Sequence, residues 1–224
     1  MRKNTQDLVS TSAYSDQLEM SDEKKVSDAS YWESAYHEGR DGWELGRATP
    51  PLVRAVSWLG APSGVAIALG SGRGHEARML AEAGWPRVIG LDFAPEAKRQ
   101  AELLTPTDLV DQLEWRMGDI FELGKSSPSE FALAIEHTSF CAIDPSRRED
   151  WMRSVFLAIR PGGHLLALFY LHQKPDGPPF GAKREDVEKS LKAAGFVIER
   201  EEIPSDSIER RRNEEWLVLA RRPS

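Results

Sequence analysis

The stretch that decides the fold is GVAIALGSGRG, residues 64–74, in which an apolar run leads into three glycines at alternate positions. The run 64–69 has the length and composition of a buried strand. Glycines at 70, 72 and 74 allow a tight turn whose backbone can approach a ligand without a Cβ clash. A helical pattern follows over 75–82. The stretch therefore predicts a strand, a glycine-rich turn and a helix, as at the ligand site of doubly wound α/β folds.

Strands and helices are expected to alternate along the rest of the chain. The expected strands are 64–69, 87–91, 113–117, 131–135 and 165–171, with 196–200 and 216–220 as a closing pair. The expected helices are 31–36, 50–59, 75–82, 95–104, 146–159 and 184–194, and a turn is expected at 161–163. Because the inner strands are continuously apolar, we expect a mostly parallel sheet covered on both faces. The fold class is therefore α/β, with a doubly wound domain over about 50–224.

The first 27 residues have a different composition. They carry scattered charges, five serines and few apolar side chains, which predicts a disordered tail over 1–27 and one domain over 28–224. Arg2 and Lys3 are not followed by the apolar segment of a signal peptide, so we expect a cytoplasmic protein.

Composition excludes several classes of function. The 224 residues carry 29 basic and 36 acidic side chains, a net charge of −7, with 40% apolar and 29% charged residues. No apolar run approaches the roughly 18 residues of a membrane span. The single cysteine, Cys141, allows neither a disulfide framework nor a thiolate zinc site, and no metal is expected. A pI near 5.4 argues against a duplex-binding surface, so we expect no nucleic-acid partner.

Asp92 follows Gly70 by 22 residues and ends the second expected strand. A carboxylate at this place can accept hydrogen bonds from the two hydroxyls of a ribose. A dinucleotide fingerprint would need a third glycine where this chain has His75. The pattern therefore favours S-adenosylmethionine, which has a ribose and no phosphate. The alternative is a tight turn, with Gly70 and Gly72, beside an ordinary surface aspartate.

A second acid follows the third expected strand in MGDIF, residues 117–121. In this fold that strand end lies beside the adenine of a bound nucleoside. Asp119 can accept from the adenine amino group while Ile120 and Phe121 flank the ring. The alternative is a turn aspartate without a ligand.

Three separated stretches resemble the thiopurine S-methyltransferase superfamily, and most closely its halide/thiol (thiocyanate) methyltransferase branch. They are YWESAYHEGRDGWELGRATP at 31–50, EHTSFCAIDPSRR at 136–148 and GPPF at 177–180. The resemblance implies a class I methyltransferase: a three-layer sandwich around a mostly parallel seven-stranded sheet, with an antiparallel strand near one edge. It also implies N-terminal helices, within about 28–60, that cover the cofactor; we call this segment the cover.

The resemblance implies that the protein transfers the methyl group of S-adenosylmethionine to a thiol, thiopurine, thiocyanate, hydrogen sulfide or halide by in-line displacement, leaving S-adenosylhomocysteine. It also implies a monomer. Another small acceptor, a cofactor-binding regulatory protein and a nicotinamide oxidoreductase remain as alternatives. The cofactor positions implied by the family are Trp32, Tyr36, Trp43, Gly70, Asp92, Asp119, Ile120 and His137. The chain departs from the family at Leu69, Ser71, Tyr36 and His137, where proline, cysteine, tryptophan and tyrosine are common.

Two side chains are candidates for catalysis. His137 can orient or deprotonate a neutral thiol, or it can simply hydrogen-bond near the cofactor carboxylate. Arg148 matches an arginine near the substrate in the thiopurine branch and can attract an anionic nucleophile. Its alternative is a solvated surface arginine, as we also expect for residues 210–212. Cys141 is expected to pack in the interior, and His75 is expected to have no role.

Overall fold

The computed structural model describes residues 26–174 and 176–224. Its seven-stranded sheet has the order β3-β2-β1-β4-β5-β7-β6. The strands are β1 (Val65–Leu69), β2 (Arg87–Asp92), β3 (Leu113–Met117), β4 (Phe131–His137), β5 (Ile159–Tyr170), β6 (Val197–Glu202) and β7 (Glu215–Arg221). β7 pairs antiparallel with β5 and β6, and the other pairs are parallel. The predicted α/β fold with a mostly parallel sheet is confirmed.

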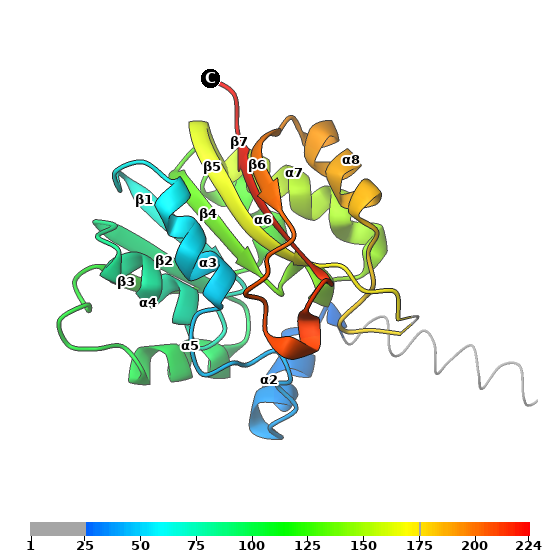
Figure 1. Cartoon of the computed structure of the whole chain (residues 1–224). Coiled ribbons are helices and arrows are strands. Elements are labelled where there is room, and N and C mark those ends of the chain that lie inside the picture. Colours follow the sequence, from blue (N-terminus) through cyan, green and yellow to red (C-terminus); the bar gives the residue numbers. More distant parts are fainter. Residues whose placement is uncertain (1–25, 175) are drawn as a thin grey trace, which may run out of the picture.

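Helices cover both faces of the sheet (Figure 1). One face carries α3 (Pro50–Ala55), continued by a 3₁₀ turn at Val56–Trp58, and α4 (His75–Glu82). The other carries α6 (Ile120–Ser126), α7 (Arg148–Ala158) and α8 (Arg184–Ala194). α5 (Pro95–Leu103) packs beside β2 and β3, and α2 (Ala29–His37) contacts α5. In Figure 1, α2 stands apart from the three layers.

The first strand shows why both faces are apolar. Ala66 and Ala68 belong to the core under α3 and α4, while Ile67 and Leu69 belong to the core under α7. Successive side chains of a strand point to opposite faces, so a strand between two helical layers needs apolar residues at every position.

The structure differs from the sequence-based expectation at two places. Helix α6 was not predicted; it begins where the Asp119 side chain accepts the amide of Phe121. The turn expected at 161–163 is instead an irregularity within β5, where the register against β4 shifts. Arg222 explains this, because its amide and carbonyl pair with Gly163 and Gly162 and keep the segment in the sheet.

The strand order reverses between β1 and β4. After β1 the chain turns at Gly70 into α4 on one face of the sheet, and after β4, which ends at His137, it reaches α7 on the other face. In open α/β sheets such a switch point forms a ligand crevice beyond the carboxyl ends of the strands. Among the described residues, every helix is too short or too polar to span a bilayer.

We predict that Gly74→Ala strongly destabilises the protein. Gly74 begins α4 at φ +79°, and an added Cβ would lie 2.1 Å from the Trp115 ring. Gly84→Ala is a matched control, because Gly84 has φ +90° but no atom within 4 Å of such a Cβ. The control should cost roughly 1–2 kcal/mol of backbone strain, and Gly74→Ala about 2 kcal/mol more. Urea unfolding measures both, and equal losses would show that the contact with Trp115 is unimportant.

Candidate active site

A cavity of about 530 Å³ lies at the switch point. It is lined by residues that follow the first four strands, including Gly70, Asp92, Gly118 and Thr138, together with aromatic residues of the cover. The volume lies within the range of small-molecule sites. The structure thus brings the glycine loop and the predicted acids together around one space.

Asp92 is oriented by backbone amides. Its Oδ2 accepts from the Gly72 nitrogen and its Oδ1 from the Ala94 nitrogen, both at 2.9 Å. The side chain lines the cavity, and the residue is only 9% exposed. Burial raises the pKa of the Asp92 carboxyl, and the amide hydrogen bonds oppose that rise. Each carboxylate oxygen has two acceptor positions, so this group can still receive the two hydroxyls of a ribose.

Gly70, the first glycine of the loop, has no space for a side chain. A Cβ on Gly70, at φ +55°, would lie 2.7 Å from the Cβ of Ser139. Gly70 lines the cavity, whereas Gly72 contributes the amide that orients Asp92.

The second acid follows the neighbouring strand, β3, which pairs with β2 up to Asp92 and Met117. Asp119 Oδ1 accepts the Phe121 amide at 2.9 Å and caps α6, which leaves acceptor capacity on the carboxylate. Asp119, Ile120 and Phe121 all line the cavity. The Arg147 guanidinium lies 3.6 Å from the centre of the Phe121 ring.

Three aromatic rings of the cover close the cavity. Trp32 and Tyr36 meet Trp43 edge to face, with ring centres 5.4 and 5.6 Å apart. The Trp32 Nε1 group donates to the Val26 carbonyl at 3.0 Å. Val26 and Ser27 also line the cavity, although both were assigned to the N-terminal tail; residues 1–25 of that tail lie outside the described residues. The faces of the Trp32, Tyr36 and Trp43 rings are suited to contact a cationic sulfonium group.

An ion-pair cluster attaches the cover to the glycine loop. Arg73 contacts Asp41 at 2.6 Å and Glu44 at 2.9 Å, and His75 Nε2 contacts Glu44 Oε1 at 2.8 Å. Burial raises the pKa of the Glu44 carboxyl, but hydrogen bonds from His75, Arg73 and Gly46 outweigh it and lower the pKa to about 2. The expectation that His75 has no role was wrong, because it helps to hold the cover in place.

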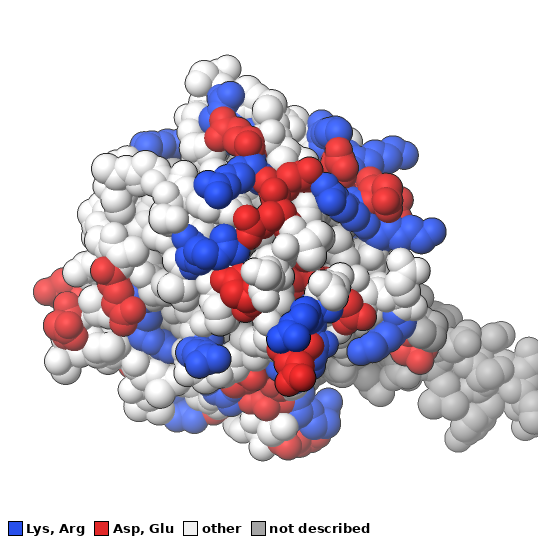
Figure 2. All heavy atoms as spheres, viewed as in Figure 1, with Lys and Arg blue, Asp and Glu red and all other residues white. Residues whose placement is uncertain are grey.

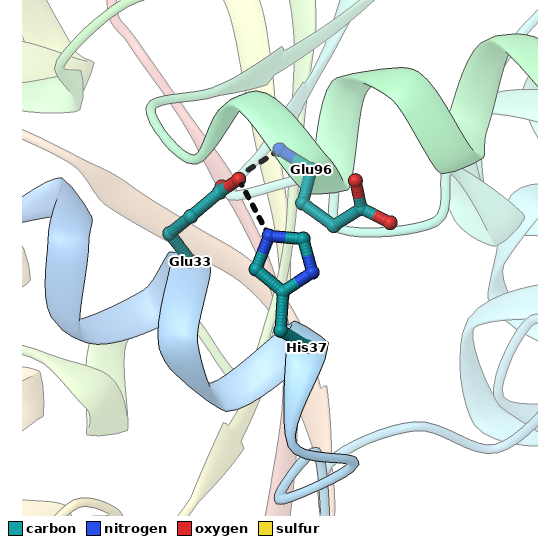
Figure 3. Close-up of side chains that lie close together, drawn as sticks. All are labelled: Glu33, His37 and Glu96. Carbon is teal, nitrogen blue, oxygen red and sulfur yellow. Dashed lines mark hydrogen bonds and ion pairs between the residues drawn. The ribbon is translucent and has the colours of Figure 1, made fainter.

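Helix α2 of the cover is also docked on α5 (Figure 3). Glu33 accepts from the Glu96 amide at 2.8 Å and from His37 Nε2 at 3.2 Å. Ala94, at the start of α5, offers no side-chain cap, so Glu33 satisfies an amide of the first turn from another helix. The side chains of Glu33, His37 and Glu96 lie within 4.8 Å of one another. Both carboxylate oxygens of Glu96 accept hydrogen bonds from Arg99. The contact that joins the two helices is therefore the one between Glu33 and the Glu96 backbone amide.

Cationic side chains outnumber acidic ones around the cavity. Its described lining includes Arg40, Arg147, Lys174, Arg210 and Arg211, against Asp92 and Asp119, so the formal sum is 5 − 2 = +3. The chain as a whole carries −7. Figure 2 shows a different pattern on the outer face, where acidic and basic side chains alternate. Two of the cations have acidic partners outside the lining, since Arg40 Nε lies 2.6 Å from Glu38 and Arg211 Nη1 lies 3.5 Å from Glu215. The lining itself carries more cationic than acidic side chains, whereas the chain as a whole does not.

Arg211 was missed by sequence reasoning. The expectation of a solvated edge at 210–212 was wrong for this residue, which is only 5% exposed and lines the cavity. It lies in a 3₁₀ turn, Glu209–Arg211, between β6 and β7. The acidic residues beside it in the sequence are typical of an exposed segment, so nothing in the sequence indicated its burial. Arg211 reaches the cavity because β7, which follows it, lies beside β5 in the sheet.

The two predicted catalytic residues lie behind the cavity wall, and neither is part of its lining. His137 Nδ1 contacts Glu76 Oε1 at 3.0 Å, and its Nε2 receives the Arg211 Nη1 group at 3.0 Å. Arg148 donates to the carbonyls of Phe180 and Gly181, both at 2.9 Å, and so supports the 177–181 loop. Arg147, its neighbour, is the arginine that faces the cavity.

Cys141 is buried and lines the cavity, and its thiol donates to the Thr138 carbonyl. Burial raises the pKa of this thiol to about 12. A neutral, hydrogen-bonded thiol fits the expected packing role.

We predict that Glu136→Gln stabilises the protein at high pH. The Glu136 carboxyl is 1% exposed and accepts from the Phe140 amide and the Ser139 hydroxyl, and burial raises its pKa to about 7. Because this pKa exceeds the unfolded value near 4.5, native stability falls as pH rises from that value through about 7. At about pH 8 the variant should therefore be more stable by roughly 1–3 kcal/mol, with little difference near pH 4.5.

Urea unfolding at both pH values measures this effect. Glu122→Gln, on the exposed side of α6, is the control and should change stability by less than about 0.5 kcal/mol. A Glu136→Gln difference that does not depend on pH would contradict the prediction.

We predict that Glu33→Ala weakens binding of S-adenosylhomocysteine. Losing a carboxylate that caps a helix start costs about 1 kcal/mol. Here the loss weakens the free energy with which α2 of the cover docks on α5. The dissociation constant should rise by about fivefold in calorimetry. Ser34→Ala on the same helix is the control, because the Ser34 hydroxyl bonds only within α2. Equal affinities would show that docking on α5 is not needed for cofactor binding.

The site fits S-adenosylmethionine. Asp92 offers carboxylate oxygens of the kind that accept ribose hydroxyls, Asp119 offers an acceptor for an amino group beside the apolar Ile120 and Phe121, and the rings of the cover offer faces for a cation. Gly70 lines the same cavity, and packing against Ser139 is the reason that this position excludes a side chain.

Comparisons with known proteins agree with this geometry. A model of the thiopurine S-methyltransferase family matches residues 27–222. Thiocyanate methyltransferase 1 of Brassica oleracea is 32% identical over 191 residues, covering 83% of this chain and 82% of the relative. A thiopurine S-methyltransferase of Nitrosomonas eutropha is 27% identical over 190 residues, covering 77% and 86%.

A solved structure shares the fold. The 1,6-didemethyltoxoflavin-N1-methyltransferase of Burkholderia thailandensis, with bound S-adenosylhomocysteine, superimposes with a TM-score of 0.69 at 19% identity and covers 100% of this chain and 99% of that one. The family match over nearly the whole chain and a site that fits the cofactor lead to one conclusion: the chain belongs to the thiopurine S-methyltransferase family and is an S-adenosylmethionine-dependent methyltransferase.

Proposed function

We propose that this methyltransferase acts on a small acceptor that arrives as an anion, such as a thiolate, hydrosulfide, thiocyanate or halide. The observation that carries the proposal is the formal surplus of +3 around the cavity of a chain with charge −7. A site with a surplus of one sign of charge concentrates ions of the other sign. The names of the plant relatives, thiocyanate and thiol methyltransferases, point in the same direction.

When bound, S-adenosylmethionine supplies a methyl group on a positively charged sulfur, which a soft anion can displace in line without a general base. The chain then has to position the acceptor and exclude water. The rings of Trp32, Tyr36 and Trp43 cover the cavity, and Asp92 and Asp119 lie at its nucleoside end.

The acceptor is attracted by the arginines of the cavity. Arg147 stacks on Phe121, and Arg211 lies 5.3 Å from the centre of the Tyr170 ring, so neither guanidinium is freely mobile. An arginine that is held in place loses little freedom when it binds an anion. Arg148 takes no part in this contact and instead supports the loop that carries Pro178 and Pro179 to the cavity.

We also propose that the protein works as a monomer in the cytoplasm and acts on a small molecule rather than on nucleic acid or at a membrane. One chain supplies the glycine loop, both acids and the aromatic cover of the cavity, so the proposed site does not require a residue from a partner. Light scattering should give a mass near 25.1 kDa, and a dimer whose partner residues enter the site would contradict it. Cell fractionation tests the location.

We predict that Arg147→Ala raises the KM for thiocyanate by about tenfold and changes kcat less, because a held cation is lost. Headspace detection of methyl thiocyanate, methyl iodide and methanethiol measures turnover. Arg153→Ala is the control, since Arg153 lies on α7 and is not part of the described cavity lining.

Arg148→Ala should mainly lower the melting temperature, because the carbonyls of Phe180 and Gly181 lose their hydrogen-bond donor.

Two outcomes would overturn the proposal. Added salt screens exposed charges, so the proposal expects the KM of an anionic acceptor to rise at high salt. One contrary outcome is a preference for neutral acceptors, with a KM that stays the same at high salt. The other is tight cofactor binding without product from any anionic acceptor, which would favour a regulatory protein.

A further inference from the structure

We propose that His137 is a positioning residue: its neutral imidazole accepts a hydrogen bond from the Arg211 guanidinium and holds it at the cavity, so that the ion pair between Arg211 and Glu215 stays long at 3.5 Å. The inference rests on the proposed function, in which Arg211 helps to bind an anionic acceptor. It assigns His137, the last residue of β4, a task that differs from deprotonation of a thiol, which was one of the roles left open by the sequence.

The contacts of the ring determine its tautomer. A guanidinium has five donors and no acceptor, so the His137 Nε2 atom that lies 3.0 Å from Arg211 Nη1 must accept. The proton is then on Nδ1, which donates to Glu76 Oε1 at 3.0 Å. The His137 side chain is 9% exposed, and both of its ring nitrogens are engaged. A ring held in this way has no free nitrogen for an acceptor thiol.

Glu76 is suited to fix this tautomer. Its Oε1 also accepts from the Thr49 amide at 3.2 Å, which anchors the carboxylate at the start of α4. Hydrogen bonds from the His137 Nδ1–H group and from the Thr49 amide both favour the ionised form of the Glu76 carboxyl, against the effect of its burial. An ionised Glu76 therefore faces the Nδ1–H group.

Glu215 competes for the same guanidinium. Its Oε1 lies 3.5 Å from Arg211 Nη1, longer than the 2.7–2.9 Å of a strong charged hydrogen bond. Glu215 is 1% exposed, and its other oxygen, Oε2, has no hydrogen-bond partner among the described residues. Without the His137 side chain, the Arg211 guanidinium can move closer to the Glu215 carboxylate. Its charge would then be neutralised there and would attract an anion in the cavity less strongly.

Two substitutions of His137 separate positioning from base catalysis. In His137→Gln the side-chain oxygen can accept from Arg211 and the amide can donate to Glu76, but the side chain cannot take up a proton. His137→Leu removes both contacts. His164→Gln is the matched control, because His164 contacts only Glu199 at the edge of β5 and lies outside the described cavity lining.

Calorimetric titration of thiocyanate into the S-adenosylhomocysteine complex measures the effect on the site. His137→Leu should weaken thiocyanate binding about tenfold, with less than about a threefold change in S-adenosylhomocysteine affinity. His137→Gln should restore thiocyanate affinity and the KM to within about threefold of the native chain. In a double-mutant cycle, His137→Leu should add little to Arg211→Gln. A glutamine variant that binds thiocyanate well but fails to methylate a neutral thiol would restore the base role and overturn the proposal.

A second readout does not depend on the acceptor. Nitrogen-15 spectra of the histidine rings should show His137 protonated on Nδ1 in the native chain, and exchange between tautomers in Arg211→Gln. A ring protonated on Nε2 in the native chain would overturn the positioning role. If the native chain binds no thiocyanate but the spectra show the Nδ1–H form, the proposed acceptor is wrong and the contact between His137 and Arg211 still stands.

Discussion

The carboxylate of Asp92 is the constraint on which the site depends. Its oxygens accept amides of the glycine loop and of the residue before α5, and its backbone carbonyl accepts the Gly118 amide after β3. A buried carboxylate is costly unless hydrogen bonds satisfy it. Those bonds connect one strand end to the segments expected to hold the ribose and the adenine. Because α5 also receives Glu33 from the cover, the same strand end determines where the cover docks.

The electrostatics of the site differ from those of the whole molecule. The chain is acidic, yet the cavity is lined by a surplus of arginine and lysine. These side chains are held by specific contacts: Arg147 by an aromatic face, and Arg211 by a histidine and a tyrosine ring. Charges held in this way attract an anion without having to reorganise, which is what a displacement reaction with an ionised nucleophile needs.

Much of the fold could be predicted because the relevant forces are local. The inner strands contain continuous apolar runs, and α4 and α8 have the bounds that their patterns indicate. Helix α6 was missed because its seven residues contain a glycine and it depends on the Asp119 cap and on α7. The irregularity inside β5 depends on Arg222, which lies about 60 residues away and reaches it only in the folded sheet.

The sequence by itself determined the acids and glycines at the strand ends, since the spacing of strands and loops follows from hydrophobic patterning. It also placed the aromatic cover and the segment after β4 at one site, through resemblance to a family. Only the tertiary structure decided where side chains within those segments point: Arg147 faces the cavity and Arg148 the loop behind it, although they are adjacent. It also decided that Arg211 and His75 belong to the site region. The reason is physical, because the direction of a side chain depends on partners far away in the chain, such as Glu76 for His137 and Glu44 for His75.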